Sequence, residues 1–155
     1  DLDDPRITLA GVVFEVHDGL TSRLGTRGAP TNEVLIRLAR SPDQSLRMSD
    51  LAAQVTMSAS GLSRAIDRLV ASGSIERVAC DYDRRVVHAR LTEQGMAELE
   101  AMLPEHLRVL EDSFSVLSAA ERDQFEKLLR KLRRKVNPEA VQASDAPASR
   151  VATAS

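Results

Sequence analysis

Residues 48–73, with the sequence MSDLAAQVTMSASGLSRAIDRLVASG, decide the fold. Apolar residues recur every three or four positions in two groups, which are Leu51, Ala52 and Val55, then Leu62, Ala65, Ile66, Leu69 and Val70. This spacing predicts two amphipathic helices separated by a short turn. Ser49 and Ser58 stand where N-capping side chains are expected, and Gly73 closes the second helix. A short helix, a tight turn and a longer helix form the helix-turn-helix arrangement.

Helical spacing also precedes this stretch. Leu9, Val13, Val16, Leu20 and Leu24 predict a helix from about Ile7 to Leu24. Gly25 and Gly28 are expected to end it, and Pro30 to act as a further helix breaker. Val34, Leu35, Leu38 and Ala39 then predict a short helix that ends before Pro42.

After Gly73 the pattern changes from helical spacing to alternation. Ile75–Ala79, a polar tip over residues 80–85 and a β-branched run over Val86–Leu91 predict a β-hairpin. Thr92 is expected to cap a long helix that reaches Leu117 and is kinked at Pro104. A last helix carries Phe125, Leu128, Leu129, Leu132 and Val136. Residues 137–155 lack apolar periodicity, so we expect a disordered tail.

Helices followed by a two-stranded hairpin predict a mainly α (α+β) fold, a winged helix-turn-helix with long flanking helices. We expect a single domain made of an N-terminal dimerisation helix (1–29), a winged helix-turn-helix lobe (30–91), C-terminal dimerisation helices (92–136) and the tail. The flanking helices carry apolar stripes too long to be covered inside a chain of 155 residues. They therefore predict a homodimer.

The composition of the chain limits the classes of function that it can have. The chain has 43% hydrophobic and 28% charged residues and a formal net charge of −2, which is typical of a globular domain and not of a uniformly basic nucleic-acid binder. Residues 45–95 hold seven basic and six acidic side chains, so any nucleic-acid face depends on placement more than on net charge. One cysteine, no leader and no membrane-length apolar run predict a cytoplasmic protein without membrane contact.

Several stretches together resemble the MarR (multiple antibiotic resistance regulator) family. They are residues 46–52 (LRMSDLA), residues 57–69 (MSASGLSRAIDRL), Gly73, and the segment from Asp83-Arg84-Arg85 to Leu91-Thr92-Glu93-Gln94-Gly95. The likeness spans residues 30–100, whereas the flanking helices resemble the family only in length and apolar spacing. It implies a homodimer that binds a palindromic double-stranded DNA operator, as a repressor that a small aromatic ligand can release.

The second helix of the helix-turn-helix and the hairpin both offer candidate DNA contacts. Small residues at the start of the second helix allow close approach to phosphates and base edges, and Arg64 is a long donor for a base edge. One turn further, Arg68 is expected to reach phosphate. The helix candidates are Ser58, Ser60, Gly61, Ser63, Arg64 and Arg68. Ser58 is expected to act as an ordinary N-cap as well.

At the hairpin tip, Asp83 is expected to accept local backbone hydrogen bonds and to hold a neighbouring guanidinium. An arginine at such a tip can enter a narrow, electronegative minor groove. The resemblance implies that Arg85 is inserted and that Arg84 contacts phosphate, although the residues alone leave open which arginine points inward.

Other interpretations carry less support. Val13, Phe14 and His17 lie about one turn apart on the first helix, and the resemblance makes them candidates for an effector pocket, although Val13 also belongs to the apolar stripe. A winged helix can instead serve as a protein-interaction module, but such a module would tend to present apolar or acidic residues on its second helix. No motif indicates an enzyme, a cofactor or a metal site, and Cys80 lacks the partner that a redox switch would use.

The last helix is strongly basic, and the helix over residues 92–117 carries six acidic residues. Opposed charges on adjacent amphipathic helices favour helix pairing, within or between subunits, over a second DNA-binding stripe.

Overall fold

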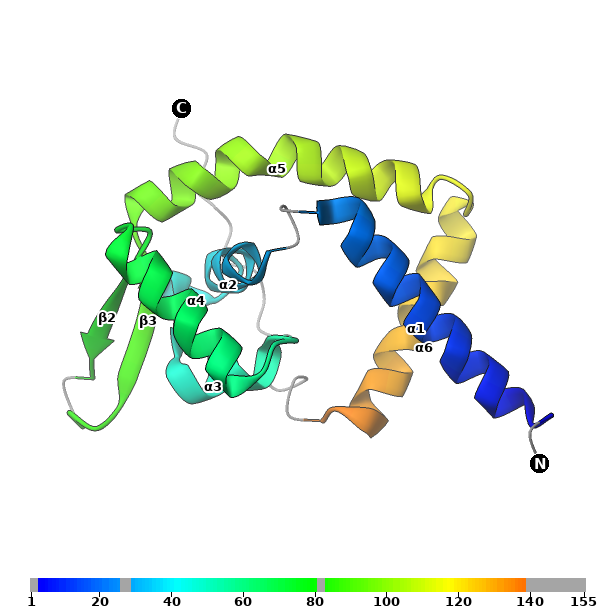
Figure 1. Cartoon of the computed structure of the whole chain (residues 1–155), viewed down its shortest axis with the longest axis horizontal. Helices are drawn as coiled ribbons and strands as arrows, with labels where there is room; N and C mark the ends of the chain where they lie inside the picture. The colour runs from blue at the N-terminus through cyan, green and yellow to red at the C-terminus, as the bar shows by residue number, and fades with distance from the viewer. Residues whose placement is uncertain (1–2, 26–28, 81–82, 139–155) are drawn as a thin grey trace.

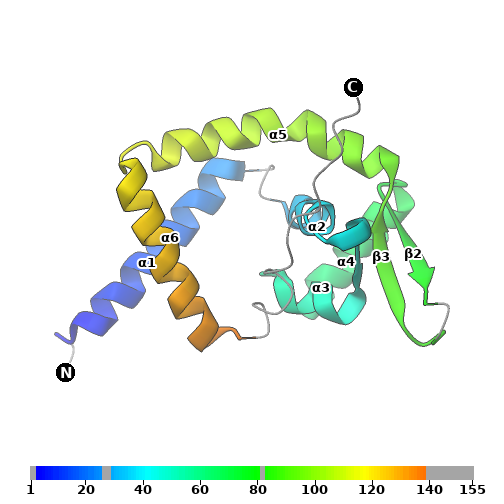
Figure 2. The same cartoon turned by 180° about the vertical axis from the view of Figure 1, so that it is seen from behind.

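The computed structural model describes residues 3–25, 29–80 and 83–138. The elements follow in the order α1 (Pro5–Leu24), α2 (Pro30–Ala39), a 3₁₀ turn (Pro42–Gln44), β1 (Ser45–Arg47), α3 (Met48–Gln54), α4 (Ala59–Ala71), β2 (Ile75–Ala79), β3 (Val87–Leu91), α5 (Glu93–Phe114) and α6 (Ala119–Val136). The long helix α5 joins two regions, with the described residues of 30–91, here called the winged lobe, at one end and α1 and α6 at the other (Figures 1 and 2).

The sheet is antiparallel, with strand order β1-β3-β2. β3 lies in the centre, where Ala89 pairs with Leu46 of β1 and with Arg77 of β2. At the hairpin end, the Cys80 backbone N–H donates to the Val86 carbonyl oxygen at 2.9 Å. The β2–β3 pair is therefore a wing anchored on a third strand.

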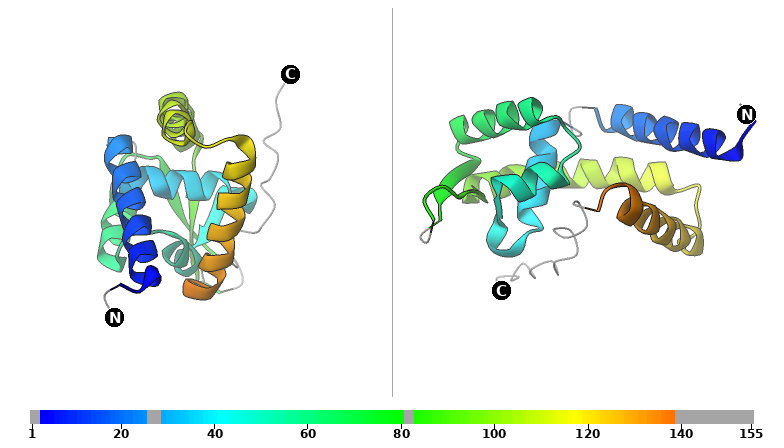
Figure 3. Two further views of the ribbon diagram at one scale, coloured as in Figure 1. Left: turned by 90° about the vertical axis from the view of Figure 1, so that its right-hand side faces the viewer. Right: turned by 90° about the horizontal axis from the view of Figure 1, so that it is seen from below.

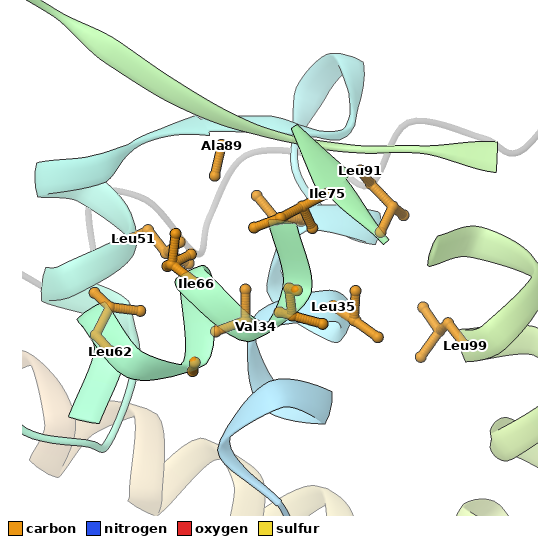
Figure 4. Packing of buried hydrophobic residues seen from close by; sticks show 12 residues of the cluster. Val34, Leu35, Leu51, Leu62, Ile66, Ile75, Ala89, Leu91 and Leu99 are labelled. Atoms are coloured by element: carbon orange, nitrogen blue, oxygen red, sulfur yellow. The ribbon is translucent and has the colours of Figure 1, made fainter. Parts of the chain in front are cut away.

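One apolar core holds the winged lobe together. Its fully enclosed side chains include Val34 and Leu38 from α2, Leu51 from α3, Ile66 from α4 and Ala89 from β3. Figure 4 shows Ile75 and Leu91 continuing this core towards Leu99 on α5. The core thus fixes α4 and the wing on a common scaffold that extends into α5.

Helices α1 and α6 differ from the lobe because neither buries a residue. They lie apart from each other near the same end of α5 (Figure 3). Large apolar side chains on both are exposed, including Leu9, Phe14, Leu128 and Leu132 at 62%, 67%, 54% and 46%. Water-exposed apolar surface on this scale is typical of an interaction surface.

The junction between α4, β2 and α5 is closely packed. Thr92 caps α5 by accepting from the Gly95 N–H at 3.0 Å, and its hydroxyl donates to the Gly73 carbonyl oxygen at 2.7 Å. The Ser74 hydroxyl donates to the Glu98 carboxylate at 2.6 Å, which lowers the pKa of that carboxyl, and a hydrogen bond from Gln94 lowers it further. Side-chain hydrogen bonds therefore tie the start of α5 to the end of α4.

The structure confirms the expected winged helix-turn-helix and corrects several local predictions. Pro30 begins α2 and does not merely break α1, because the first helical position needs no N–H donor. Ser49 is not an N-cap: α3 begins at Met48, after Arg47, without a side-chain cap. The sequence interpretation missed β1. Helix α5 ends at Phe114 and not at Leu117, and Pro104, where a kink was expected, lies inside it.

Two further predictions fall partly or wholly outside the described residues. Gly28 was expected to help end α1, but only the Gly25 part of that prediction lies in the described chain, where Gly25 follows the helix with a φ of 54°. The tail was expected from residue 137, and its residues 139–155 are outside the described ranges.

Some of the basic residues on α6 form ion pairs with acidic residues of the same helix. Lys127 pairs with Asp123 at 2.6 Å and Arg130 with Glu126 at 2.7 Å. Asp112 of the acidic helix α5 pairs instead with Arg23 of α1. The pairing of acidic and basic helices, within or between subunits, that the opposed charges favour stays a prediction.

Candidate nucleic-acid interface

The outer face of α4 presents polar and cationic side chains to solvent. Buried Leu62, Ala65, Ile66 and Leu69 fix the inner face on the core. The opposite face exposes the predicted contacts Ser60, Ser63, Arg64 and Arg68. Neither arginine on this face forms an ion pair with any residue that the structure describes. Two guanidinium groups are thus available to an external anion or base edge.

The first turn of α4 is closed by Ser58, whose hydroxyl accepts from the Gly61 N–H at 3.1 Å and lies 3.2 Å from the Ser60 hydroxyl. Ser58 is therefore the N-cap that its position predicted. A Cβ on Gly61 would lie 3.2 Å from the Ser58 oxygen, a tight contact. Glycine at this position keeps the cap close to the helix end.

We expect Ser58→Ala to lower the free energy of unfolding by about 1 kcal/mol, because one N–H group at the start of α4 loses its acceptor. Urea denaturation followed by circular dichroism measures the change. Ser63→Ala is the matched control, since Ser63 is exposed inside the same helix and does not cap it. Equal losses in the two variants would contradict the capping role.

Two polar contacts that sequence reasoning missed fix the position of the helix-turn-helix. Arg77 of β2 donates to Asp67 on the exposed face of α4 at 2.6 Å, so the wing and α4 are joined directly. Glu33 of α2 accepts from both the backbone N–H and the hydroxyl of Thr56, each at 2.9 Å, in the turn before α4. Neither pair has a short-range sequence signal, because its partners belong to different elements.

The described part of the wing tip holds the predicted trio. Asp83 accepts from the Arg85 backbone N–H at 3.0 Å and from its guanidinium Nε at 3.1 Å. These hydrogen bonds, the side-chain ones most strongly, lower the pKa of the Asp83 carboxyl. The Arg85 side chain remains 92% exposed, and Arg84 is exposed as well. Asp83 therefore orients Arg85 without covering it.

The predicted residues form two groups on one lobe. The α4 group and the wing group belong to elements that share the core, and the β2–β3 hairpin projects past α4 (Figure 1). A helix with small polar residues and free arginines, beside an arginine-bearing hairpin, can engage two adjacent grooves of a duplex.

The three candidate effector residues lie on α1, outside this interface. Phe14 lines a shallow hollow with Asp4, Arg6, Ile7, Ala10 and Gly11, whereas Val13 and His17 do not line it. The His17 Nδ1 atom lies 3.1 Å from the Asp18 carboxylate. Their role in ligand binding remains a prediction.

Within the described residues, no group of three His, Cys, Asp or Glu side chains is placed to hold a metal ion. No helix in the same part of the chain is long and apolar enough to cross a membrane. Cys80 is a partly buried free thiol at the end of β2.

Comparison with known proteins adds an independent line of evidence. Residues 33–86 match the sequence profile of the MarR family. The transcriptional repressor MprA of Escherichia coli K12 is 38% identical over 98 residues, which cover 63% of this chain and 56% of MprA. The chain therefore spans about half the length of this curated relative.

Solved structures show the same architecture over more of the chain. AbsC, a MarR family transcriptional regulator from Streptomyces coelicolor, is 28% identical, with a TM-score of 0.74 over 89% of this chain and 98% of its own. A variant of Escherichia coli MarR, solved in complex with operator DNA, is 25% identical, with a TM-score of 0.70 over 85% of this chain and 98% of its own. The winged lobe of the chain therefore matches the MarR family in sequence, and its helix-turn-helix, wing and flanking helices are arranged as in solved MarR family regulators.

Proposed function

We propose that this protein is a sequence-specific DNA-binding transcriptional regulator, acting as a repressor. The observation that carries the proposal is the exposed face of α4. Arg64 and Arg68 on this face form no ion pair within the described chain, and small polar residues share the face with them. In this role α4 enters the major groove, and Arg85 on the wing enters the adjacent minor groove. A binding role of this kind involves no catalysis, and a chromosomal target places the protein in the cytoplasm.

The operator in this proposal is an inverted repeat bound by a homodimer. The exposed apolar residues of α1 and α6, together with Leu103 and Leu107 of α5, supply a surface for a second copy. A two-fold dimer presents two α4 helices, so half-sites are expected about one helical turn apart. Selection of bound fragments from the source genome would identify the repeat, and recovery of unrelated fragments without symmetry would refute this arrangement.

Release by a small aromatic ligand is the regulatory part of the proposal. The candidate residues Val13, Phe14 and His17 are all exposed on α1, so a pocket around them needs a wall from another copy of the chain. Titration of the dimer on its operator with phenolic carboxylates tests this, and an unchanged affinity would remove ligand release from the proposal.

The arginines are expected to have separable effects on DNA binding. Arg64→Ala should weaken operator binding by about 1–3 kcal/mol and relax sequence preference, because a bidentate contact to a base edge discriminates by that amount. Arg68→Ala should weaken binding to all duplexes alike. Arg85→Ala should weaken binding to operators with A·T-rich flanks most, because its partner is a narrow minor groove.

Fluorescence titrations on the operator and on a scrambled duplex, at two salt concentrations, measure these differences. Arg108→Ala on α5 is the control, since Arg108 pairs locally with Glu105 and belongs to neither α4 nor the wing. If the three variants keep full operator affinity while binding to a protein partner disappears, the chain is an interaction module and not a DNA-binding regulator.

A further inference from the structure

A second basic feature lies beside the wing and is separate from the predicted contacts on α4. A hollow of about 490 Å³ opens between the end of β1, the start of α3 and the tip side of the wing. Its lining consists of Arg47, Met48, Ser49, Arg77, Arg85, Val86 and Val87. Three arginines and one serine therefore line a common space whose lining contains no acidic residue.

The three arginines of this hollow are not equivalent. Arg77 is held by Asp67 at 2.6 Å, and Arg85 is held by Asp83 at 3.1 Å. Arg47 is exposed, and no described residue forms an ion pair with it. The hollow thus has two arginines neutralised by fixed partners and one whose positive charge is uncompensated.

The position of the hollow indicates which external group could pair with the charge of Arg47. Arg47 ends β1 opposite His88 of the central strand β3, and Arg77 connects the same wall to α4 through Asp67. If α4 lies in a major groove and the wing in the next minor groove, one sugar-phosphate strand must pass between them. The surface available to that strand includes this hollow.

We propose that the hollow is a seat for a DNA backbone phosphate and that Arg47 is its direct contact. The inference rests on the proposed DNA-binding function and adds a residue that the helix and wing motifs do not include. Arginine suits a phosphate because its planar guanidinium can donate two parallel hydrogen bonds. The exposed Ser49 hydroxyl, on the same lining, supplies a further donor.

Phosphate contacts make the DNA affinity depend more steeply on salt concentration than base contacts do. Removing one phosphate contact lowers the magnitude of the slope of log K against log salt concentration by about 0.9. A dimer carries two copies of Arg47, so Arg47→Gln should lower the magnitude of that slope by about 2. The affinity should fall by the same factor on an operator and on a scrambled duplex, because the backbone carries no direct sequence information.

The experiment titrates labelled duplexes, long enough to span two half-sites, with the dimer at four salt concentrations. Arg47→Gln removes the charge and keeps a shorter polar side chain. Arg47→Lys, which keeps the charge, should restore most of the slope, and Arg108→Ala should leave affinity and slope unchanged. Thermal melting of each variant shows whether the fold is intact. An unchanged melting temperature means that a loss of affinity comes from the missing phosphate contact and not from a disturbed start of α3.

These titrations distinguish failure of the phosphate seat from failure of the proposed DNA-binding function. If the wild-type dimer binds DNA and Arg64→Ala weakens it, while Arg47→Gln changes neither affinity nor slope, the phosphate seat is refuted and the DNA-binding role stands. A sequence-dependent loss of affinity in Arg47→Gln would also overturn the proposal, since it would indicate base readout. Failure of the wild-type protein to bind any duplex would overturn both.

Discussion

Replacing Gly95 with alanine is expected to lower the free energy of unfolding by about 3 kcal/mol, near the upper end of overpacking effects. A Cβ at this buried position would lie 2.0 Å from the Ser74 carbonyl oxygen and 2.8 Å from the Leu91 Cδ1 atom. The first distance is far below any van der Waals contact. Either α5 or the start of β2 would have to move.

The contact cannot be relieved by a rotating side chain, because its nearest atom belongs to the backbone. That backbone is held in place: the Ser74 N–H donates to the Leu69 carbonyl oxygen at 2.9 Å, and the Ser74 carbonyl oxygen accepts from the Thr92 N–H at 3.1 Å. Moving Ser74 would therefore disturb the end of α4 and the cap of α5 together.

Urea denaturation monitored by circular dichroism measures this effect. Gly19→Ala is the matched control, because nothing lies within 4 Å of a Cβ at Gly19 in α1. That control is expected to be neutral or more stable, since alanine favours a helix interior by about 1 kcal/mol over glycine. Equal denaturation midpoints for Gly95→Ala and the wild type would show that α5 can shift without cost.

The second large effect concerns assembly. Leu129→Asp is expected to separate the proposed dimer and to weaken operator binding by roughly 100-fold or more, because two linked lobes gain avidity of that order. Leu129 is 39% exposed on α6, beside Phe125 and Leu132 in the same apolar stripe. An aspartate there would have to be desolvated in a dimer interface but not in a monomer.

Light scattering gives the molecular mass, and titration on an operator duplex gives the affinity. Arg134→Gln is the control, because it causes the same change in net charge at an exposed position on the opposite side of α6. A Leu129→Asp protein that remains dimeric with unchanged affinity would exclude α6 from the dimer interface.

Much of this fold could be predicted because its signals are local. The three- and four-residue spacing of Leu62, Ile66 and Leu69 fixed which face of α4 is buried, and the remaining face then contained the exposed arginines. Ser58 was recognisable as an N-cap from its position alone. The local geometry around Asp83 and Arg85 likewise depends on residues two apart, so the hairpin pattern indicated it.

The features that could not be predicted depend on tertiary contacts. β1 has only three residues, too few to establish an alternating pattern, and it becomes a strand by pairing with β3. The Asp67–Arg77 pair joins two elements whose relative position is set by the packed core and not by local spacing. The hollow around Arg47 was missed for the same reason, since its lining comes from three separate stretches of chain.

The closely packed junction at Gly95 has a mechanical consequence for operator choice. The 22 residues of α5 make a rod about 33 Å long between the winged lobe and the proposed dimer surface. A tilt of about 6° at one end of such a rod moves the other end by about 3.4 Å, the rise of one base pair. In the proposed dimer, a stiff junction is therefore expected to restrict binding to operators with one number of base pairs between the two half-sites.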